Sequence, residues 1–231
     1  MTNIDFHNHL RVYSPCSQFD KSELKMLMSD MNLSIVGITD HETIKGAQAL
    51  KKEAKFIVIT GMEVTTGFGD FLVFSKDKEY MKKLSFDYEE EGSIVMPRSL
   101  KDMRSDKDSV IIWAHPHIRD DKDEMNQQEI DYIMTTVDAI ELCNGSVMTA
   151  LYAGRYQAKE YLIPLWNLAQ KYNKPCTGSS DTHASNQFMK CWTAFEADIK
   201  TQSDFVDAIK SGKFKPVTCE DYECLIKDLK L

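Results

Sequence analysis

Short apolar runs alternate with polar segments along most of the chain. Seven of these runs are apolar on both faces or rich in Val and Ile, which is typical of strands buried in a parallel sheet. They lie at 3–6, 34–39, 55–60, 70–74, 110–114, 137–142 and 175–179. We therefore expect a sheet whose strands are largely buried.

The segments between these runs include four with helical periodicity, at 20–32, 43–54, 154–173 and 201–212. Asp20 or Ser22 can cap the first helix, and Gly212 is expected to end the last. Pro164 predicts a kink or break in the third helix. Strands that alternate with helices favour a parallel α/β sheet, open or closed into a barrel.

Length and composition indicate a globular protein. The 231 residues, 42% hydrophobic and 28% charged, suffice for one large domain or two small ones. Because α/β barrels of this size commonly form one domain, we expect residues 1–231 to fold as a single unit. Within it, residues 75–108 are predicted to be a charged helical excursion and residues 219–231 a C-terminal tail.

The net charge of −8, from 28 basic and 36 acidic residues, makes long nucleic acid an unlikely partner. No apolar run is long enough to cross a membrane, and the first residues do not have the pattern of a secretory signal. The six cysteines show no Cys-x-x-Cys pair. We therefore expect reduced thiols in a cytoplasmic protein, of unknown oligomeric state.

Ionisable residues follow the apolar runs at their expected carboxyl ends. All six histidines belong to this set, and none falls in a predicted helix. In a parallel α/β barrel these ends converge on one face, where the chemistry takes place. Unrelated structural histidines would also occur in helices and charged loops. The set is His7, His9, Asp40, His41, Glu63, His115, His117, Glu141, Asp181 and His183.

The predicted donors are imidazole nitrogens and carboxylate oxygens, without a cysteine in the set. Such donors suit Zn²⁺, Mn²⁺ or Fe²⁺. They are too many for one ion, since a catalytic zinc usually takes three protein ligands and a water. Two or three ions bridged by a carboxylate are therefore expected, an arrangement that serves hydrolysis.

Five short motifs resemble those of the PHP (polymerase and histidinol phosphatase) domain family. They are DFHNH at 5–9, TDH at 39–41, GME at 61–63, AHPH at 114–117 and SDTH at 180–183. Their order matches the family pattern, and the resemblance extends over nearly the whole chain. It implies a distorted (β/α)7 barrel and a metal-dependent phosphoesterase.

The resemblance also implies roles for individual residues. His7, His9, Glu63 and Asp181 resemble the ligands of a first metal ion. Glu63 would bridge to a second ion that takes His115, while His41 and His183 resemble ligands of a third. Asp40 is assigned to the catalytic group as a carboxylate that orients a ligand. His117 is the candidate for protonating the leaving group.

Two segments depart from the family pattern. Many small members carry an acidic residue or histidine soon after the His-x-His motif, but residues 11–17 offer only Ser14 and Cys16. The number of ions beyond two therefore stays open. Asp70 stands where relatives often have a histidine, and we expect it to bind the second ion. An aspartate there would favour oxygen-preferring metals such as Mn²⁺.

The expected substrate is a small phosphorylated metabolite or nucleotide. Arg11, Arg119 and Arg155 each follow a predicted site loop and are the candidates for binding phosphate. Asn144, together with Glu141, is expected to line the pocket without binding metal. Two alternatives remain: a metal-dependent amidohydrolase, which would normally need a bridging lysine, and a non-catalytic metal-binding PHP module.

Overall fold

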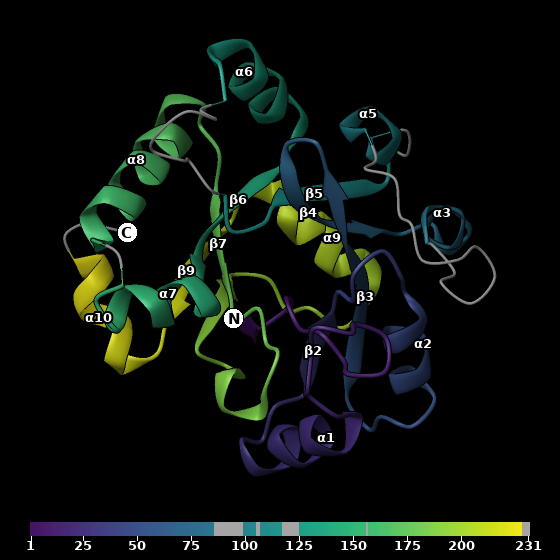
Figure 1. Ribbon diagram of the computed structural model, residues 1–231. Helices are drawn as coiled ribbons and strands as arrows, with labels where there is room; N and C mark the ends of the chain where they lie inside the picture. The colour runs from purple at the N-terminus through teal and green to yellow at the C-terminus, as the bar shows by residue number, and fades with distance from the viewer. Residues whose placement is uncertain (86–98, 105–106, 117–124, 156, 228–231) are drawn as a thin grey trace.

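The computed structural model describes residues 1–85, 99–104, 107–116, 125–155 and 157–227. Six strands form a curled sheet in the order β2-β3-β4-β5-β6-β7, with helices packed around it (Figure 1). The strands are β2 (Ile35–Ile38), β3 (Ile57–Thr66), β4 (Gly69–Ser75), β5 (Ser109–Trp113), β6 (Ala139–Asn144) and β7 (Cys176–Ser179). All seven predicted strand runs overlap observed strands.

The sheet is mixed, because β4 runs antiparallel to both of its neighbours, β3 and β5. The pairs β2/β3, β5/β6 and β6/β7 are parallel, as predicted. A parallel crossover needs a dozen or more residues, whereas only residues 67–68 separate β3 from β4. The prediction of a wholly parallel sheet is therefore wrong at this hairpin.

Residues 5–9, here called the closing segment, fill the gap between β2 and the chain that follows β7. On one side, the N–H groups of Gly37 and Thr39 donate to carbonyls of this segment, each over 3.0 Å. On the other side, the N–H of Thr182 donates to the carbonyl of His7 over 3.2 Å. The six-stranded sheet and the closing segment thus form the distorted α/β barrel that the sequence predicts.

The closing segment is also anchored by aromatic packing. The Phe6 ring meets Phe74 of β4 and Phe205 of α9 (Gln202–Ser211) edge to face, with ring centroids 5.7 and 5.4 Å apart. All three rings are fully buried. Aromatic pairs in this arrangement contribute beyond the area that they bury, so the first residues of the chain are held firmly in the barrel.

A second, antiparallel sheet lies beside the barrel in the order β1-β8-β9. Its strands are β1 (Thr2–Ile4), β8 (Cys191–Phe195) and β9 (Phe214–Thr218). The last two do not correspond to any predicted strand. Pro216 lies within β9, and proline is compatible with a strand at the edge of a sheet, which is the position of β9.

The helices that surround the sheets include the four predicted ones. Asp20 is the N-cap of α1, and Gly212, with φ of +66°, ends α9 as predicted. Pro164 lies inside α8, which continues through it, so the predicted break does not occur. Besides α9, the α-helices of the described residues are α1 (Lys21–Asp30), α2 (Lys45–Lys51), α3 (Lys78–Leu84), α5 (Leu100–Met103), α6 (Gln127–Thr136), α7 (Gly145–Tyr152), α8 (Ala158–Lys171) and α10 (Glu220–Ile226).

The predicted excursion and tail are more closely packed than expected. Helices α3 and α5, from the 75–108 segment, bury four side chains in the core: Met81, Leu84, Leu100 and Met103. Residues 86–98 and 105–106 of that segment lie outside the described residues. In the 219–231 segment, α10 buries Tyr222, whose hydroxyl forms a 2.7 Å hydrogen bond with Thr149 of α7.

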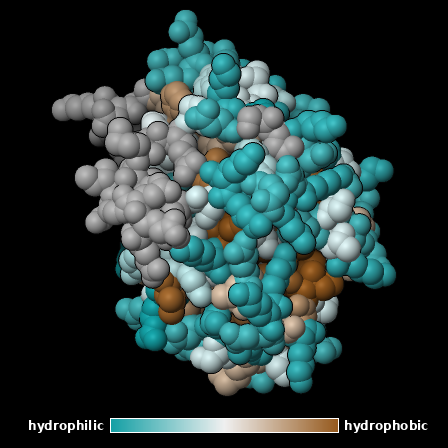
Figure 2. Space-filling model, turned by 90° about the vertical axis from the view of Figure 1, so that its right-hand side faces the viewer, coloured by the Kyte–Doolittle hydropathy of each residue, from teal (hydrophilic) through white to brown (hydrophobic). Residues whose placement is uncertain are grey.

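The surface shown in Figure 2 is mostly hydrophilic, in keeping with the high proportion of charged residues. Within the described ranges, every helix is too short or too polar to span a membrane. All six cysteines are free thiols.

Gly37 provides a test of the barrel closure. A Cβ at this position would lie 2.5 Å from Phe6 Cβ and 2.6 Å from Phe6 Cα. We expect Gly37→Ala to lower the free energy of unfolding by roughly 1–3 kcal/mol, because the overpacking would push the closing segment away from β2. Urea denaturation measures this change. Gly67→Ala is the matched control, since a Cβ there meets nothing within 4 Å; an equal loss in both variants would contradict the prediction.

Candidate metal centre

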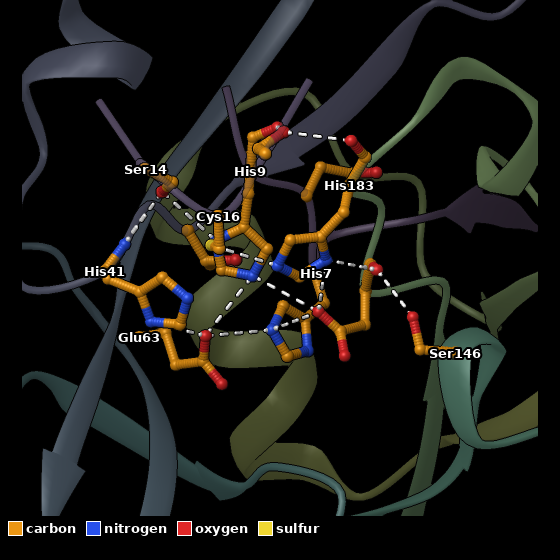
Figure 3. A network of polar contacts seen from close by, with 12 residues as sticks. His7, His9, Ser14, Cys16, His41, Glu63, Ser146 and His183 are labelled. Atoms are coloured by element: carbon orange, nitrogen blue, oxygen red, sulfur yellow. Dashed lines mark hydrogen bonds and ion pairs between the residues drawn. The ribbon is translucent and has the colours of Figure 1, made fainter. Parts of the chain in front are cut away.

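Eight predicted metal ligands meet on one face of the barrel. Each belongs to at least one group of three whose ligand atoms lie within 4.8 Å of one another. We call these residues the histidine–carboxylate cluster. Figure 3 shows five of them converging: His7, His9, His41, Glu63 and His183. The members are His7, His9, His41, Glu63, Asp70, His115, Asp181 and His183. The structure thus brings together residues that are spread over most of the chain.

His7 has one ring nitrogen anchored and the other directed into the cluster. Its Nδ1 lies 3.0 Å from Glu141 Oε1. Because an ionised carboxylate only accepts hydrogen bonds, Nδ1 is the donor. Nε2 then faces Glu63 Oε2 at 3.4 Å and Asp181 Oδ1 at 3.5 Å. This carboxylate–imidazole pairing is a common way to orient a metal-binding histidine.

His9 is oriented through Ser14. The Ser14 hydroxyl donates to Asp40 Oδ1 over 3.0 Å and lies 3.3 Å from His9 Nδ1. Its oxygen can therefore accept the Nδ1 proton, so that His9 Nε2 faces Glu63 Oε2 at 3.2 Å and Asp181 Oδ1 at 3.3 Å. Asp40 thus contacts His9 through Ser14, the kind of indirect position expected for it from the sequence.

Four buried atoms at the centre of the cluster have no hydrogen-bond partner among the described residues. They are His7 Nε2, His9 Nε2, Glu63 Oε2 and Asp181 Oδ1. The nitrogen–oxygen distances between them are 3.2 to 3.5 Å. A tetrahedral zinc ion with ligand bonds of about 2.0–2.1 Å holds its ligand atoms about 3.3–3.4 Å apart. The residues present therefore fit a divalent metal ion.

Glu63 faces both sides of the cluster. Its Oε2 lies 3.0 Å from His41 Nδ1, and its Oε1 lies 2.9 Å from His115 Nε2. Asp70 joins Glu63 and His115 in one group, and its Oδ1 accepts a 2.8 Å hydrogen bond from Thr65 across the β3–β4 hairpin. A carboxylate that presents one oxygen to each neighbouring group has the geometry needed to bridge two ions.

His183 brings a cysteine to the edge of the cluster. Its Nδ1 lies 3.0 Å from the carbonyl of Asp181, and its Nε2 lies 3.2 Å from Cys16 Sγ. The groups of ligand atoms within 4.8 Å of one another contain no cysteine among the described residues, in keeping with the predicted donor set. Cys16, which the sequence offers after the His-x-His motif, lies beside the cluster because long-range contacts position residues 11–17.

Two of the predicted ligands have unusual backbone conformations. His115 has φ of +27° and Asp181 has φ of +54°, both in the left-handed region that non-glycine residues rarely adopt. The His115 N–H donates to Glu141 Oε2 over 2.8 Å, which helps to hold this conformation. Strained backbone of this kind is concentrated at functional sites, where the surrounding contacts maintain it.

Glu141 and Asn144 lie beneath the cluster, where they hold its members. In addition to His7 and His115, Glu141 accepts hydrogen bonds from Ser179 and Asn144. Asn144 also donates to Asp181 Oδ2 over 3.3 Å and caps α7. It was predicted to line the substrate pocket, but its side chain is buried among these partners.

The predicted arginines do not join the cluster in the described structure. Arg11 is 60% exposed and pairs with Asp20 at 3.1 Å. Arg155 is exposed beyond the end of α7. Arg119 and His117 lie outside the described residues, so their predicted roles stay predictions.

Burial and mutual contacts shift the pKa values of the cluster in opposite directions. Burial alone would lower the pKa of His9 and of His115, but hydrogen bonds and attraction from carboxylates outweigh it and raise both pKa values to about 9. Burial also opposes the charge of Glu63, yet the surrounding histidines hold its pKa well below the usual range. The outer histidines, His41 and His183, have lowered pKa values, chiefly because of burial.

Comparison with known proteins supports this fold. Residues 166–214, which include Asp181 and His183, match the PHP-associated family model PHP_C. No curated protein sequence matches the chain.

Three solved structures are similar over most of the chain. PsfC from Pseudomonas syringae PB-5123 has a TM-score of 0.64 at 17% identity and covers 99% of this chain and 96% of its own. A two-domain protein from Bacteroides vulgatus ATCC 8482, containing a predicted PHP-like metal-dependent phosphoesterase, has a TM-score of 0.66 at 16% identity. It covers 94% of this chain, which spans 64% of that protein. An amidohydrolase from Chromobacterium violaceum has a TM-score of 0.55 at 13% identity. The match covers 79% of this chain and 88% of that protein.

The fold and the cluster define a PHP-like α/β barrel with a set of residues suited to metal ions. At these identities the solved structures show a shared fold. The match to a PHP-associated family model is confined to residues 166–214, and one of the structural neighbours is described as PHP-like.

The raised pKa values predict how the metal-free protein responds to pH. His9 and His115 bind a proton more tightly in the folded state, with a pKa of about 9, than in the unfolded state, with a pKa of 6.5. Their contribution to stability is therefore fully present below about pH 6.5 and is lost as the pH rises towards 9. We expect the free energy of unfolding in EDTA to fall by a few kcal/mol over this range.

Urea denaturation at a series of pH values measures this loss. His115→Asn should show a smaller fall, and this difference separates the imidazole from other groups that titrate in the same range. A flat or rising stability in the unmodified chain would contradict the prediction.

Proposed function

We propose that the protein is a metal-dependent hydrolase that cleaves phosphoric ester bonds in small phosphorylated compounds. The observation that carries this proposal is a set of four buried ligand atoms that have no hydrogen-bond partner among the described residues. They belong to His7, His9, Glu63 and Asp181. Burying such atoms without partners is costly, and a divalent cation would satisfy all four at once.

The residues of the chain divide into ligands and groups that orient them. Bound divalent ions would supply Lewis-acid activation of water and of the phosphoryl oxygens. Glu63 would hold two ions at a fixed separation by offering one oxygen to each. The contact of Glu141 with His7 Nδ1, and that of Ser14, held by Asp40, with His9 Nδ1, would direct Nε2 of each imidazole towards an ion. Leaving-group protonation is assigned to His117.

The donor set favours two ions, with a third held by His41 and His183. Zn²⁺, Mn²⁺ and Fe²⁺ all accept imidazole and carboxylate ligands. In the group of Glu63, Asp70 and His115, two of the three donors are carboxylates. This group is therefore the one suited to an oxygen-preferring ion such as Mn²⁺.

A small substrate suits both the charge and the surface near the cluster. The net charge of −8 disfavours a long polyanion. Arg11 and Arg155 are exposed and would have to turn towards the cluster to bind phosphate. We propose a phosphorylated metabolite or nucleotide as the substrate, in a single domain of residues 1–231. The six free thiols are in keeping with a cytoplasmic location.

An amidohydrolase is the alternative enzyme, since one structural neighbour carries that name. An amidohydrolase would normally have a bridging lysine at the centre of its metal site. In this cluster Glu63 occupies that place. A non-catalytic metal-binding module is the other alternative. Aryl phosphate monoesters, aryl phosphate diesters and aryl amides, each assayed with Zn²⁺, Mn²⁺ and Fe²⁺, separate the three. Bound metal without turnover of any substrate would favour the module.

Asp181→Asn tests the proposed centre. We expect it to lower both the metal content, measured by elemental analysis, and phosphatase activity, the latter by at least about a hundredfold, because it removes a ligand and a buried negative charge. His9→Ala should behave in the same way. Asp198→Asn, which changes an exposed carboxylate, is the matched control. Full metal content and activity in Asp181→Asn would show that the site assignment is wrong.

Glu141→Gln tests the group that orients His7. An amide can offer its own N–H to Nδ1, which would reverse the imidazole tautomer and place a proton on Nε2. We expect metal affinity to fall about 10–100-fold while the fold is retained, as measured by competition with a chelating dye. Glu79→Gln on the exposed face of α3 is the control. Unchanged affinity would show that Glu141 has no orienting role.

A further inference from the structure

Cys16 is positioned at the entrance of the histidine–carboxylate cluster. Its Sγ lies 3.2 Å from His183 Nε2, and Figure 3 shows its side chain directed towards the imidazoles. The residue is partly exposed, whereas the histidines behind it are buried or half-buried. A thiol in this position is accessible from solvent and faces the group formed by His9, His41 and His183.

The turn that carries Cys16 is fixed from both sides. The next residue, Ser17, donates its hydroxyl to the carbonyl of His9 over 2.8 Å, and the same hydroxyl lies 3.3 Å from the carbonyl of His183. The N–H of Gln18 also donates to the carbonyl of His183 over 2.8 Å. These hydrogen bonds hold the turn that carries Cys16 against the backbone of His9 and His183.

The hydrogen bonds of His183 leave its Nε2 available on the side of Cys16. The carbonyl oxygen of Asp181 lies 3.0 Å from Nδ1 and can only accept, so Nδ1 carries the proton. Nε2 then presents a lone pair next to the sulfur. A tetrahedral zinc ion with bonds of about 2.3 Å to sulfur and about 2.0 Å to nitrogen keeps these atoms about 3.5 Å apart. The observed 3.2 Å is close to that separation.

A second observation points to a ligand at the same place. His9, His41 and His183 bring three imidazole ligand atoms within 4.8 Å of one another, a spacing that could hold a metal ion. Ser14, the other polar side chain near the histidines in this turn, is already engaged with Asp40, His9 and the N–H of His41. Cys16 is therefore the side chain of the turn that is left to complete this group.

We propose that Cys16 supplies a thiolate ligand to a metal ion held by His41 and His183. The inference rests on the metal centre of the proposed function, but not on its substrate. When the sulfur–metal bond forms, the S–H bond breaks and the proton leaves to solvent.

A thiolate gives this position a metal preference different from that of its neighbour. Sulfur ligands select Zn²⁺ and disfavour Mn²⁺, whereas the group of Glu63, Asp70 and His115 is rich in oxygen. The two ends of one cluster would then prefer different ions. Cys16→Asp should convert the sulfur-bearing end to an oxygen donor and increase the share of Mn²⁺ that the protein binds.

Cobalt substitution provides a test that does not depend on activity. We expect Co²⁺ added to the metal-free protein to produce a sulfur-to-cobalt charge-transfer band in the near ultraviolet in addition to visible ligand-field bands. Cys16→Ser should lose the charge-transfer band and bind one Co²⁺ fewer per chain, and should keep the visible bands of the remaining ions. Cys224→Ser, at an exposed cysteine of α10, is the matched control and should keep both.

The outcomes separate this inference from the proposed function. Visible bands without a charge-transfer band, or a charge-transfer band that persists in Cys16→Ser, would overturn the role of Cys16 and leave the metal centre intact. Absence of any cobalt binding would overturn both the centre and the role of Cys16. A Cys16-dependent band in a protein that hydrolyses no phosphate ester would overturn the proposed reaction and retain the thiolate ligand.

Discussion

The buried carboxylate of Glu63 is the group on which the arrangement of the cluster depends. It is almost inaccessible to solvent, and four imidazoles, those of His7, His9, His41 and His115, surround it. An isolated carboxylate in such a place would be strongly disfavoured, and the imidazoles would repel one another if charged without it. Each partner therefore makes burial of the other tolerable. The same balance explains why the pKa values of His9 and His115 are raised and that of Glu63 is lowered.

The rest of the fold holds these groups in fixed orientations. Glu63 lies within β3, which continues past it into the hairpin with β4, so its backbone is held on both sides. Glu141 and Asn144 come from the end of β6 and reach His7, His115 and Asp181. In a medium of low polarity, a hydrogen-bonded network of this kind is rigid and sensitive to the loss of any member. The ligands are thus ordered by protein contacts before any ion is considered.

Sequence periodicity predicted a buried α/β sheet with ionisable residues at the ends of its strands, because buried strands are apolar on both faces and their ends share one edge. Closure into a barrel was implied by the resemblance to the PHP family. Periodicity did not predict that β4 runs antiparallel to its neighbours, since a buried strand has the same apolar pattern in either direction. It also missed β8 and β9, which carry weaker apolar patterns. The placement of Cys16 beside His183 depends on hydrogen bonds between segments more than 160 residues apart in the chain, and local sequence does not encode such contacts.

The closing segment has a consequence for the order in which the molecule is made. His7 and His9 leave the ribosome well before their partners Asp181 and His183, which lie more than 170 residues later in the sequence. Until β7 and the residues after it emerge, the closing segment has no neighbour on one side. The cluster then also lacks Asp181 and His183. Contacts this distant in sequence form late in folding. An ion bound by all eight residues of the cluster therefore reports a finished barrel.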